Sequence, residues 1–140
     1  MMNNYGQSDH YNQWYHPDGR PAISSEERAW AMAAHLSAII AMVVSAGWLS
    51  FVGPLLVWLI KKDTSPYVRR AAAQSFNFNL GMALMTIAGW LFILTLIGIP
   101  IGVLLIAGSF LLMIWHHLRA TFATSRDEYY RYPFQFRLLD

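Results

Sequence analysis

The chain has 140 residues, of which 56% are hydrophobic and only 13% are charged, with a formal net charge of +2. Soluble domains carry about 25% charged residues, so this composition argues against a soluble globular protein. The small net charge gives no reason to expect a nucleic-acid partner. The absence of cysteine excludes disulfides and thiolate metal sites.

Charged side chains gather in residues 1–28, 61–70 and 119–140, and the two segments between these, 29–60 and 71–118, carry none. Each charge-free segment exceeds the about 20 apolar residues that cross a bilayer. The sequence therefore predicts an all-α integral membrane protein.

Three regions follow from this pattern: a disordered polar tail at 1–23, a four-helix membrane domain at 24–118 and an extended cytoplasmic tail at 119–140. The first region is polar and lacks apolar periodicity, which is typical of disorder.

The first helix is expected to begin at Ser24, because Ser24 and Glu27 have the spacing of a capping box. Small residues then recur at every fourth position, at Ala33, Ser37, Ala41 and Ser45. Such a face lets another helix approach closely, and packing within the domain is favoured over a dimer interface.

Segment 29–60 would be about 48 Å long as one straight helix, which exceeds the ~30 Å hydrocarbon core. A turn is predicted at 46–54, where Gly47, Gly53 and Pro54 disfavour a continuous helix. The second helix, which ends at Ile60, is therefore short. It either crosses the membrane fully or is re-entrant, dipping in and returning.

A basic loop follows, formed by Lys61, Lys62, Arg69 and Arg70. Ser65 and Pro66 within it have the pattern of a helix start. Segment 71–118 is then divided near Pro100 into helices at about 71–94 and 101–118.

If both charge-free segments are hairpins, all 10 Lys and Arg residues lie on one side of the membrane. Basic residues near membrane ends stay in the cytoplasm, so we expect four transmembrane helices with both the N and C termini cytoplasmic. The expected location is the cytoplasmic (inner) membrane. Ser50 and Ile99 should then lie outside and Thr64 inside, and an inaccessible Ser50 would indicate a re-entrant segment.

Four polar residues of the apolar helices, His35, Gln74, Asn77 and His116, are predicted to form one layer in the inner third of the bilayer. At 1.5 Å per residue, His35 and Asn77 lie about 10 Å from the inner boundary. Interhelical hydrogen bonding is the favoured interpretation, and a substrate path is the alternative. His116 and His117 project about 100° apart, so they are not expected to share a metal.

The C-terminal run 130–138 has apolar residues at alternate positions, as a strand does, but Pro133 restricts it to an edge or an extended surface segment. Two interpretations stay open. The run lies on the membrane surface with Arg131 and Arg137 near anionic headgroups, or it adds as a strand to a partner.

Several motifs occur together in this order: Glu27-Arg28-Ala29-Trp30, Gly53-Pro54-Leu55, Ser65-Pro66-Tyr67-Val68, Asn77-Phe78-Asn79 and Tyr130-Arg131-Tyr132-Pro133. Together they resemble the bacterial domain-of-unknown-function family forty-eight-seventy, which is similar to the twenty-kilodalton subunit of the chloroplast inner-envelope protein translocon. The resemblance covers about residues 25–138. It implies four membrane helices and no particular activity.

The expected function is that of an accessory or assembly partner of a larger membrane complex, with the lipid bilayer and other membrane proteins or further copies of itself as partners. No catalytic motif, metal site or cofactor is predicted. The alternative is a homo-oligomeric translocation or pore-forming element, a role related to protein transport. A lipid-modifying enzyme is the weakest hypothesis, because only Asp63, Asp127 and Glu128 lie near the last three helix ends.

Overall fold

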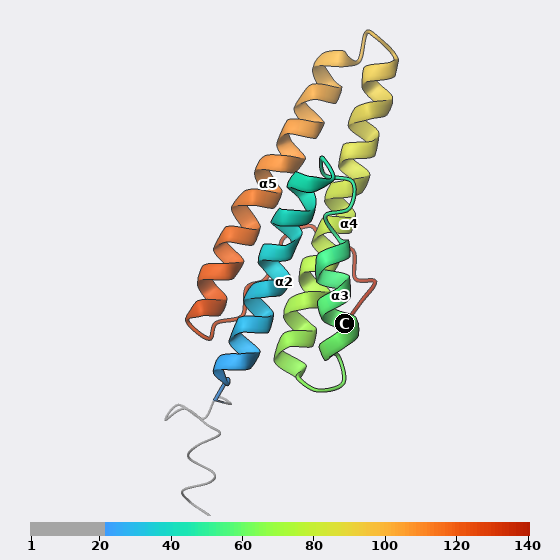
Figure 1. The fold of residues 1–140 in the computed structure, drawn as a ribbon. Helices are drawn as coiled ribbons and strands as arrows, with labels where there is room; N and C mark the ends of the chain where they lie inside the picture. The colour runs from blue at the N-terminus through green and yellow to red at the C-terminus, as the bar shows by residue number, and fades with distance from the viewer. Residues whose placement is uncertain (1–21) are drawn as a thin grey trace, which may run out of the picture.

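The computed structural model describes residues 22–140, and within them four helices pack side by side (Figure 1). They are α2 (Ser25–Val44), α3 (Val52–Lys61), α4 (Pro66–Leu94) and α5 (Ile99–Ser125). The predicted all-helical class is confirmed. The predicted tail at 1–23 lies almost wholly outside the described residues.

Helix starts follow the local capping chemistry. At α2, the backbone N–H of Glu27 donates to Ser24 Oγ at 3.1 Å, and Ser24 N–H donates to the Glu27 carboxylate at 3.0 Å. At α4, Val68 N–H donates to Ser65 Oγ at 3.3 Å, and Pro66 occupies the first turn. This cap lets α4 begin five residues before position 71, so Arg69 and Arg70 belong to the helix.

Three of these helices, α2, α4 and α5, are long and apolar enough to cross a membrane. The fourth, α3, has 10 residues. At 1.5 Å per residue it is about 15 Å long, half of a ~30 Å hydrocarbon core. The short second segment predicted from the sequence is therefore present. The helix α5 runs on through residues 119–125, so the C-terminal tail proper begins at Arg126.

The charged segments meet at one end of the bundle. Arg28 Nε lies 2.6 Å from the Asp127 carboxylate, and Lys61 Nζ lies 2.9 Å from that of Glu26. These ion pairs connect the start of α2 with the end of α5 and with the end of α3. We call this the charged end, and the turns at 45–51 and 95–98 point away from it (Figure 1).

The two turns lie at different heights. Asn79 Nδ2, on α4, donates to the Ser50 carbonyl at 3.3 Å, while Gly47 in the middle of the α2–α3 turn lies against the Phe110 ring of α5. Ser109, next to Phe110, bonds to Thr86 of α4 at 2.8 Å, and from Thr86 to the end of α4 at Leu94 is about 12 Å at 1.5 Å per residue. The α4–α5 hairpin therefore extends well past the α2–α3 turn (Figure 1).

The small-residue face of α2 packs within the bundle in part. A Cβ built on Gly53 of α3 would lie 2.6 Å from Ser37 Oγ, so these helices are in close contact there. Ala33, Ala41 and Ser45 are half-buried. The most buried face of α2 is the adjacent one, formed by Ala31, Ala34, His35, Ala38 and Met42.

Glycines let α4 and α5 approach closely in the extended part of their hairpin. A Cβ on Gly89 would lie 2.7 Å from Ile106 Cγ1 and 2.9 Å from the Gly102 carbonyl oxygen. A Cβ on Gly102 would clash with the Gly89 carbonyl and lie 2.6 Å from Ile93 Cγ1. Backbone lies against backbone here, so nothing flexible can move aside.

We predict that Gly102→Ala destabilises the protein by roughly 1–3 kcal/mol, because the added methyl must push the two backbones apart. Thermal unfolding of the purified protein in detergent measures this loss. Gly108→Ala is the matched control, since its Cβ would meet only Met85 Cε at an ordinary 3.7 Å. Equal melting temperatures for the two variants would contradict the close approach.

Candidate functional site

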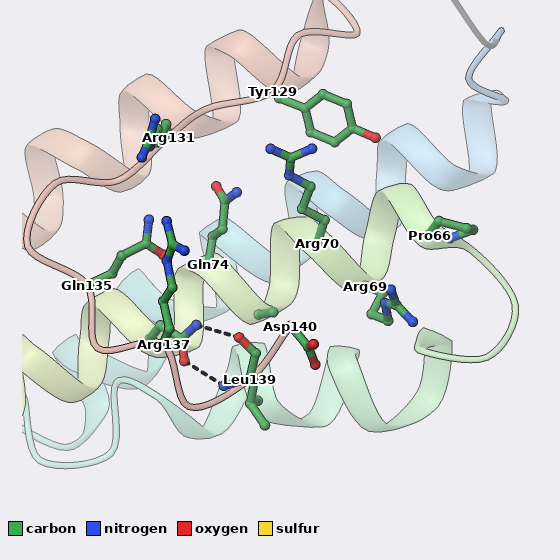
Figure 2. Close-up of a pocket in the computed structure, with 12 residues that line it drawn as sticks. Pro66, Arg69, Arg70, Gln74, Tyr129, Arg131, Gln135, Arg137, Leu139 and Asp140 are labelled. Carbon is green, nitrogen blue, oxygen red and sulfur yellow. Dashed lines mark hydrogen bonds between the residues drawn. The ribbon is translucent and has the colours of Figure 1, made fainter.

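The C-terminal tail, residues 126–140, folds back over α4 without forming a strand (Figure 1). Asn77 binds the backbone of the tail: its Oδ1 accepts from Leu138 N–H at 3.0 Å. The same Oδ1 accepts from Leu139 N–H at 2.9 Å, and Nδ2 donates to the Leu139 carbonyl at 2.7 Å (dashed lines at Leu139 in Figure 2). Trp58 Nε1 donates to the Asp140 carbonyl at 3.1 Å. An asparagine side chain thus takes the role that a neighbouring strand would have.

A buried chain of hydrogen bonds begins under this tail. The Tyr132 hydroxyl lies 2.9 Å from His35 Nδ1 and 2.7 Å from His117 Nδ1. His117 Nε2 in turn lies 3.0 Å from Asn79 Oδ1. None of these four side chains is more than 2% exposed. We call His35, Tyr132, His117 and Asn79 the buried polar chain.

The direction of each hydrogen bond follows from its last member. Asn79 Nδ2 donates to the Ser50 carbonyl, so Asn79 Oδ1 accepts the proton on His117 Nε2. A neutral His117 then has an unprotonated Nδ1, which accepts from the Tyr132 hydroxyl. The Tyr132 oxygen is left to accept from His35 Nδ1–H. One set of tautomers therefore satisfies the whole chain.

The buried polar chain joins every part of the fold. His35 belongs to α2, Asn79 to α4, His117 to α5 and Tyr132 to the tail, and the chain ends on the α2–α3 turn at Ser50. Burial raises the pKa of the Tyr132 phenol well above its ordinary value of 10.0, so the hydroxyl keeps the proton that it donates. Leaving any buried member without its partner costs free energy.

Aromatic packing surrounds these polar atoms. Phe78, which is fully buried, has its ring centroid 4.8 Å from that of Tyr132 and 5.7 Å from that of His117. The Phe78 ring also meets His116 edge-on, with the ring centroids 5.3 Å apart. Hydrocarbon around a hydrogen-bond chain strengthens each bond and raises the cost of breaking one.

The predicted polar layer is divided between three places. His35 contacts His117 through Tyr132, whereas His116 lies on a different face of α5, where its Nδ1 is 2.5 Å from the Tyr130 hydroxyl. Asn77 holds the tail. Gln74, with its amide turned to suit its neighbours, donates to the Tyr130 carbonyl and accepts from Arg70 Nε at 3.2 Å.

Three members of the buried polar chain, His117, Asn79 and Tyr132, were not among the predicted site residues. Each has a sequence neighbour that points elsewhere: His116, Asn77 and Tyr130. On a helix, residues one or two apart project to different faces, as His116 and His117 or Asn77 and Asn79 do. In the tail, a spacing of two would place Tyr130 and Tyr132 on one side of a regular strand, yet they bond to different histidines. Pairs of polar residues close together in the apolar helices indicated these positions, but which residue of each pair is buried depends on how the helix is rotated.

The four residues of the predicted basic loop lie in two different environments. Lys61 Nζ lies over the Trp30 ring at 4.7 Å, and Lys62 Nζ lies over the Trp58 ring at 4.8 Å. Arg69 and Arg70 instead line a cavity beneath the tail (Figure 2). Within residues 22–140, no group of three or more His, Asp or Glu side chains has the arrangement of a metal site.

Comparison with known proteins gives one family. The model of the magnetosome magnetite crystal formation protein family (MamF/MmsF) matches residues 26–139. No curated protein and no solved structure gives a significant match.

This match corrects the resemblance drawn from the sequence motifs. The matching family is neither domain-of-unknown-function family forty-eight-seventy nor that of the chloroplast translocon subunit. The motifs misled because membrane folding alone requires most of them. A capping box, a basic loop between hairpins and a proline at a helix start occur wherever short apolar helices begin and end at a membrane surface.

We predict that Tyr132→Phe lowers the free energy of unfolding by about 1–3 kcal/mol, because His35 and His117 both lose a buried partner. The tail should also detach more often, so trypsin should cut after Arg131 and Arg137 faster than in the parent protein. Tyr130→Phe is the control, since its partner His116 is only partly buried. Similar losses in both variants would show that the buried polar chain has no special weight.

Proposed function

We propose, because the chain belongs to the magnetosome magnetite crystal formation protein family, that it acts in magnetite crystal formation as a membrane accessory protein. The chain is a small helical membrane protein with three helices able to span a bilayer. In this proposal it has no enzymatic role. It assembles with other membrane proteins, and lipid forms the rest of its surroundings.

The distribution of charge carries this proposal. A growing magnetite surface presents iron ions, and carboxylate and imidazole groups are the side chains that bind such ions. In the described residues, the turns that face away from the charged end, 45–51 and 95–98, contain neither group. With the charged end in the cytoplasm, the side facing the crystal is apolar. Direct templating of the mineral is therefore disfavoured, and action through partners is favoured.

The membrane arrangement that we propose has α4 and α5 crossing fully while α2 and α3 form a re-entrant hairpin. If the α2–α3 turn reached the far surface, about 12 Å of the α4–α5 hairpin would protrude into water. The tip of the α4–α5 hairpin is apolar and exposed: the exposed fraction is 77% for Leu94, 76% for Leu96 and 94% for Ile97. Such a tip is stable at or within the lipid and is unfavourable in solvent.

The α2–α3 turn is itself built for an apolar environment. Gly47 N–H donates to the Met42 carbonyl at 2.7 Å, Leu49 N–H donates to Ser45 Oγ at 2.8 Å, and Asn79 caps the Ser50 carbonyl. Non-helical backbone is tolerated at membrane depth only where its polar groups are satisfied by the protein or lie in a wet cavity. These bonds support a turn that stays inside the bilayer.

The proposed function does not include a pore or translocation role. The resemblance that supported it has been overturned. The polar residues that would have lined a path bond to one another or to the tail instead, as His35 does to Tyr132 and Asn77 does to Leu139. Protein transport is therefore no part of the proposal.

We also propose which membrane holds the chain and which lipids it contacts. The family description favours the membrane around the crystal over the cytoplasmic membrane in general. Contact with anionic headgroups is expected at the charged end, where basic residues gather near the predicted inner surface.

Cysteine labelling tests the arrangement cleanly, because the chain has no cysteine of its own. We expect Ile97→Cys to react with a membrane-impermeant maleimide only from outside and Thr64→Cys only from the cytoplasmic side. Leu49→Cys, on the exposed side of the α2–α3 turn, should react from neither side. Labelling of Leu49→Cys from outside as fast as Ile97→Cys would mean that α2 and α3 cross fully.

The role in crystal formation is tested in magnetosome-forming cells that lack this protein. We expect altered magnetite crystal size by electron microscopy, restored by the parent chain, and a stoichiometric membrane partner on gentle purification. Liposomes bearing the purified protein should bind preformed magnetite no better than protein-free liposomes. Unchanged crystals in the deletion cells would refute the role, and strong magnetite binding by the liposomes would refute the accessory mechanism.

A further inference from the structure

An open cavity of about 650 Å³ lies between the first turns of α4 and the folded tail (Figure 2). Four arginines line it, and we call them the arginine cluster: Arg69, Arg70, Arg131 and Arg137. The amides of Gln74, Asn77 and Gln135 lie among them. Asp140 contributes the one carboxylate side chain of the described lining.

The arginine cluster is not used by the ion pairs of the described residues. Those pairs join Arg28 to Asp127, Lys61 to Glu26 and Arg126 to Glu128. Within residues 22–140, four arginines therefore line one open cavity with no carboxylate within 4.0 Å of their guanidinium groups. All four arginines are exposed, and an anion in the cavity would be attracted by their summed positive charge.

The backbone that carries the arginine cluster is held in place. Asn77 fixes Leu138 and Leu139 just after Arg137, and Tyr130 just before Arg131 is bonded to His116. On the helix side, the Arg70 guanidinium lies 4.6 Å over the Tyr129 ring. A site whose backbone is already ordered loses less conformational entropy when a ligand binds.

We propose that this cavity binds the phosphate group of an anionic lipid. The planar guanidinium fork matches the oxygens of a phosphate and forms paired hydrogen bonds to it. A volume of about 650 Å³ exceeds what a bare phosphate needs and has room for a headgroup.

The depth of the cavity favours a lipid as the source of the phosphate. From the end of α4 at Leu94 back to Gln74 is about 30 Å at 1.5 Å per residue, which equals the thickness of the hydrocarbon core. With the α4–α5 turn at the outer surface, Gln74 and the cavity lie at the inner headgroup layer. The inference rests on this proposed orientation but not on the role in crystal formation.

The test uses the full-length protein in phosphatidylcholine nanodiscs with a minor fraction of phosphatidylglycerol, and native mass spectrometry counts the phosphatidylglycerol molecules retained. Arg131→Gln with Arg137→Gln removes two charges from the cavity. Arg119→Gln with Arg126→Gln removes two charges from the same end of the bundle but outside the cavity. We expect the first pair to weaken retention at least about tenfold and the second by less than about threefold. Equal melting temperatures would show that both variants remain folded.

A second arm identifies the source of the phosphate. The protein in detergent is titrated with inorganic phosphate, and displacement of retained phosphatidylglycerol is followed. Displacement at low phosphate concentration, lost in the Arg131 and Arg137 variant, would support the phosphate site and assign it to the free anion. Retention unaffected by phosphate assigns it to the lipid. Equal weakening by the two double variants, or no retained anion, would overturn the site whatever the outcome for crystal formation.

Discussion

The tertiary structure depends on a single phenol. The Tyr132 hydroxyl is bonded to histidines of α2 and α5, and through His117 and Asn79 it is coupled to α4 and to the α2–α3 turn. The other contacts between these elements are mostly between alanine, glycine and larger apolar side chains, with a few hydrogen bonds such as Thr86 to Ser109 and Ser75 to the Ala34 carbonyl. In an apolar surrounding, a buried hydrogen bond has no water to replace it. The rotation and depth of α2, α4 and α5 are therefore constrained by the need to satisfy this chain of donors and acceptors.

The tail is consequently part of the fold. Backbone amide and carbonyl groups of the tail bond to Asn77, and its Tyr132 side chain enters the bundle. The tail also approaches α4 closely at Gly81, where an added Cβ would lie 3.2 Å from the Phe134 carbonyl oxygen. Docking of the tail in turn creates the cavity, because Arg131 and Arg137 come from the tail and Arg69 and Arg70 come from α4. Neither segment forms the arginine cluster alone.

Because the α4–α5 hairpin is longer than the α2–α3 hairpin, the two ends of the bundle differ in character. The charged end contains ion pairs, cation–π contacts and the arginine cluster, all suited to a wet or headgroup environment. The opposite end is the apolar tip of α4 and α5. A protein of this kind offers a growing crystal few ligands of its own, but it offers lipid and membrane partners a large surface. Family membership and fold together are consistent with a small membrane accessory protein in crystal formation.

The sequence alone determined the class of the fold, because spans free of charge, a capping box at Ser24 and a proline at position 66 act locally and act the same way in any context. It also indicated that polar residues inside the spans would matter. Only the tertiary structure decided which ones. The choice of His117 over His116 and the division of labour between Asn77 and Asn79 depend on helix rotation, which a 100° step per residue leaves open until another helix packs against it. The position of Tyr132 could not be predicted from the sequence for a different reason. Its partners are far away in the chain, and a tail with alternate apolar residues can meet a membrane surface, a strand or, as it does here, an asparagine.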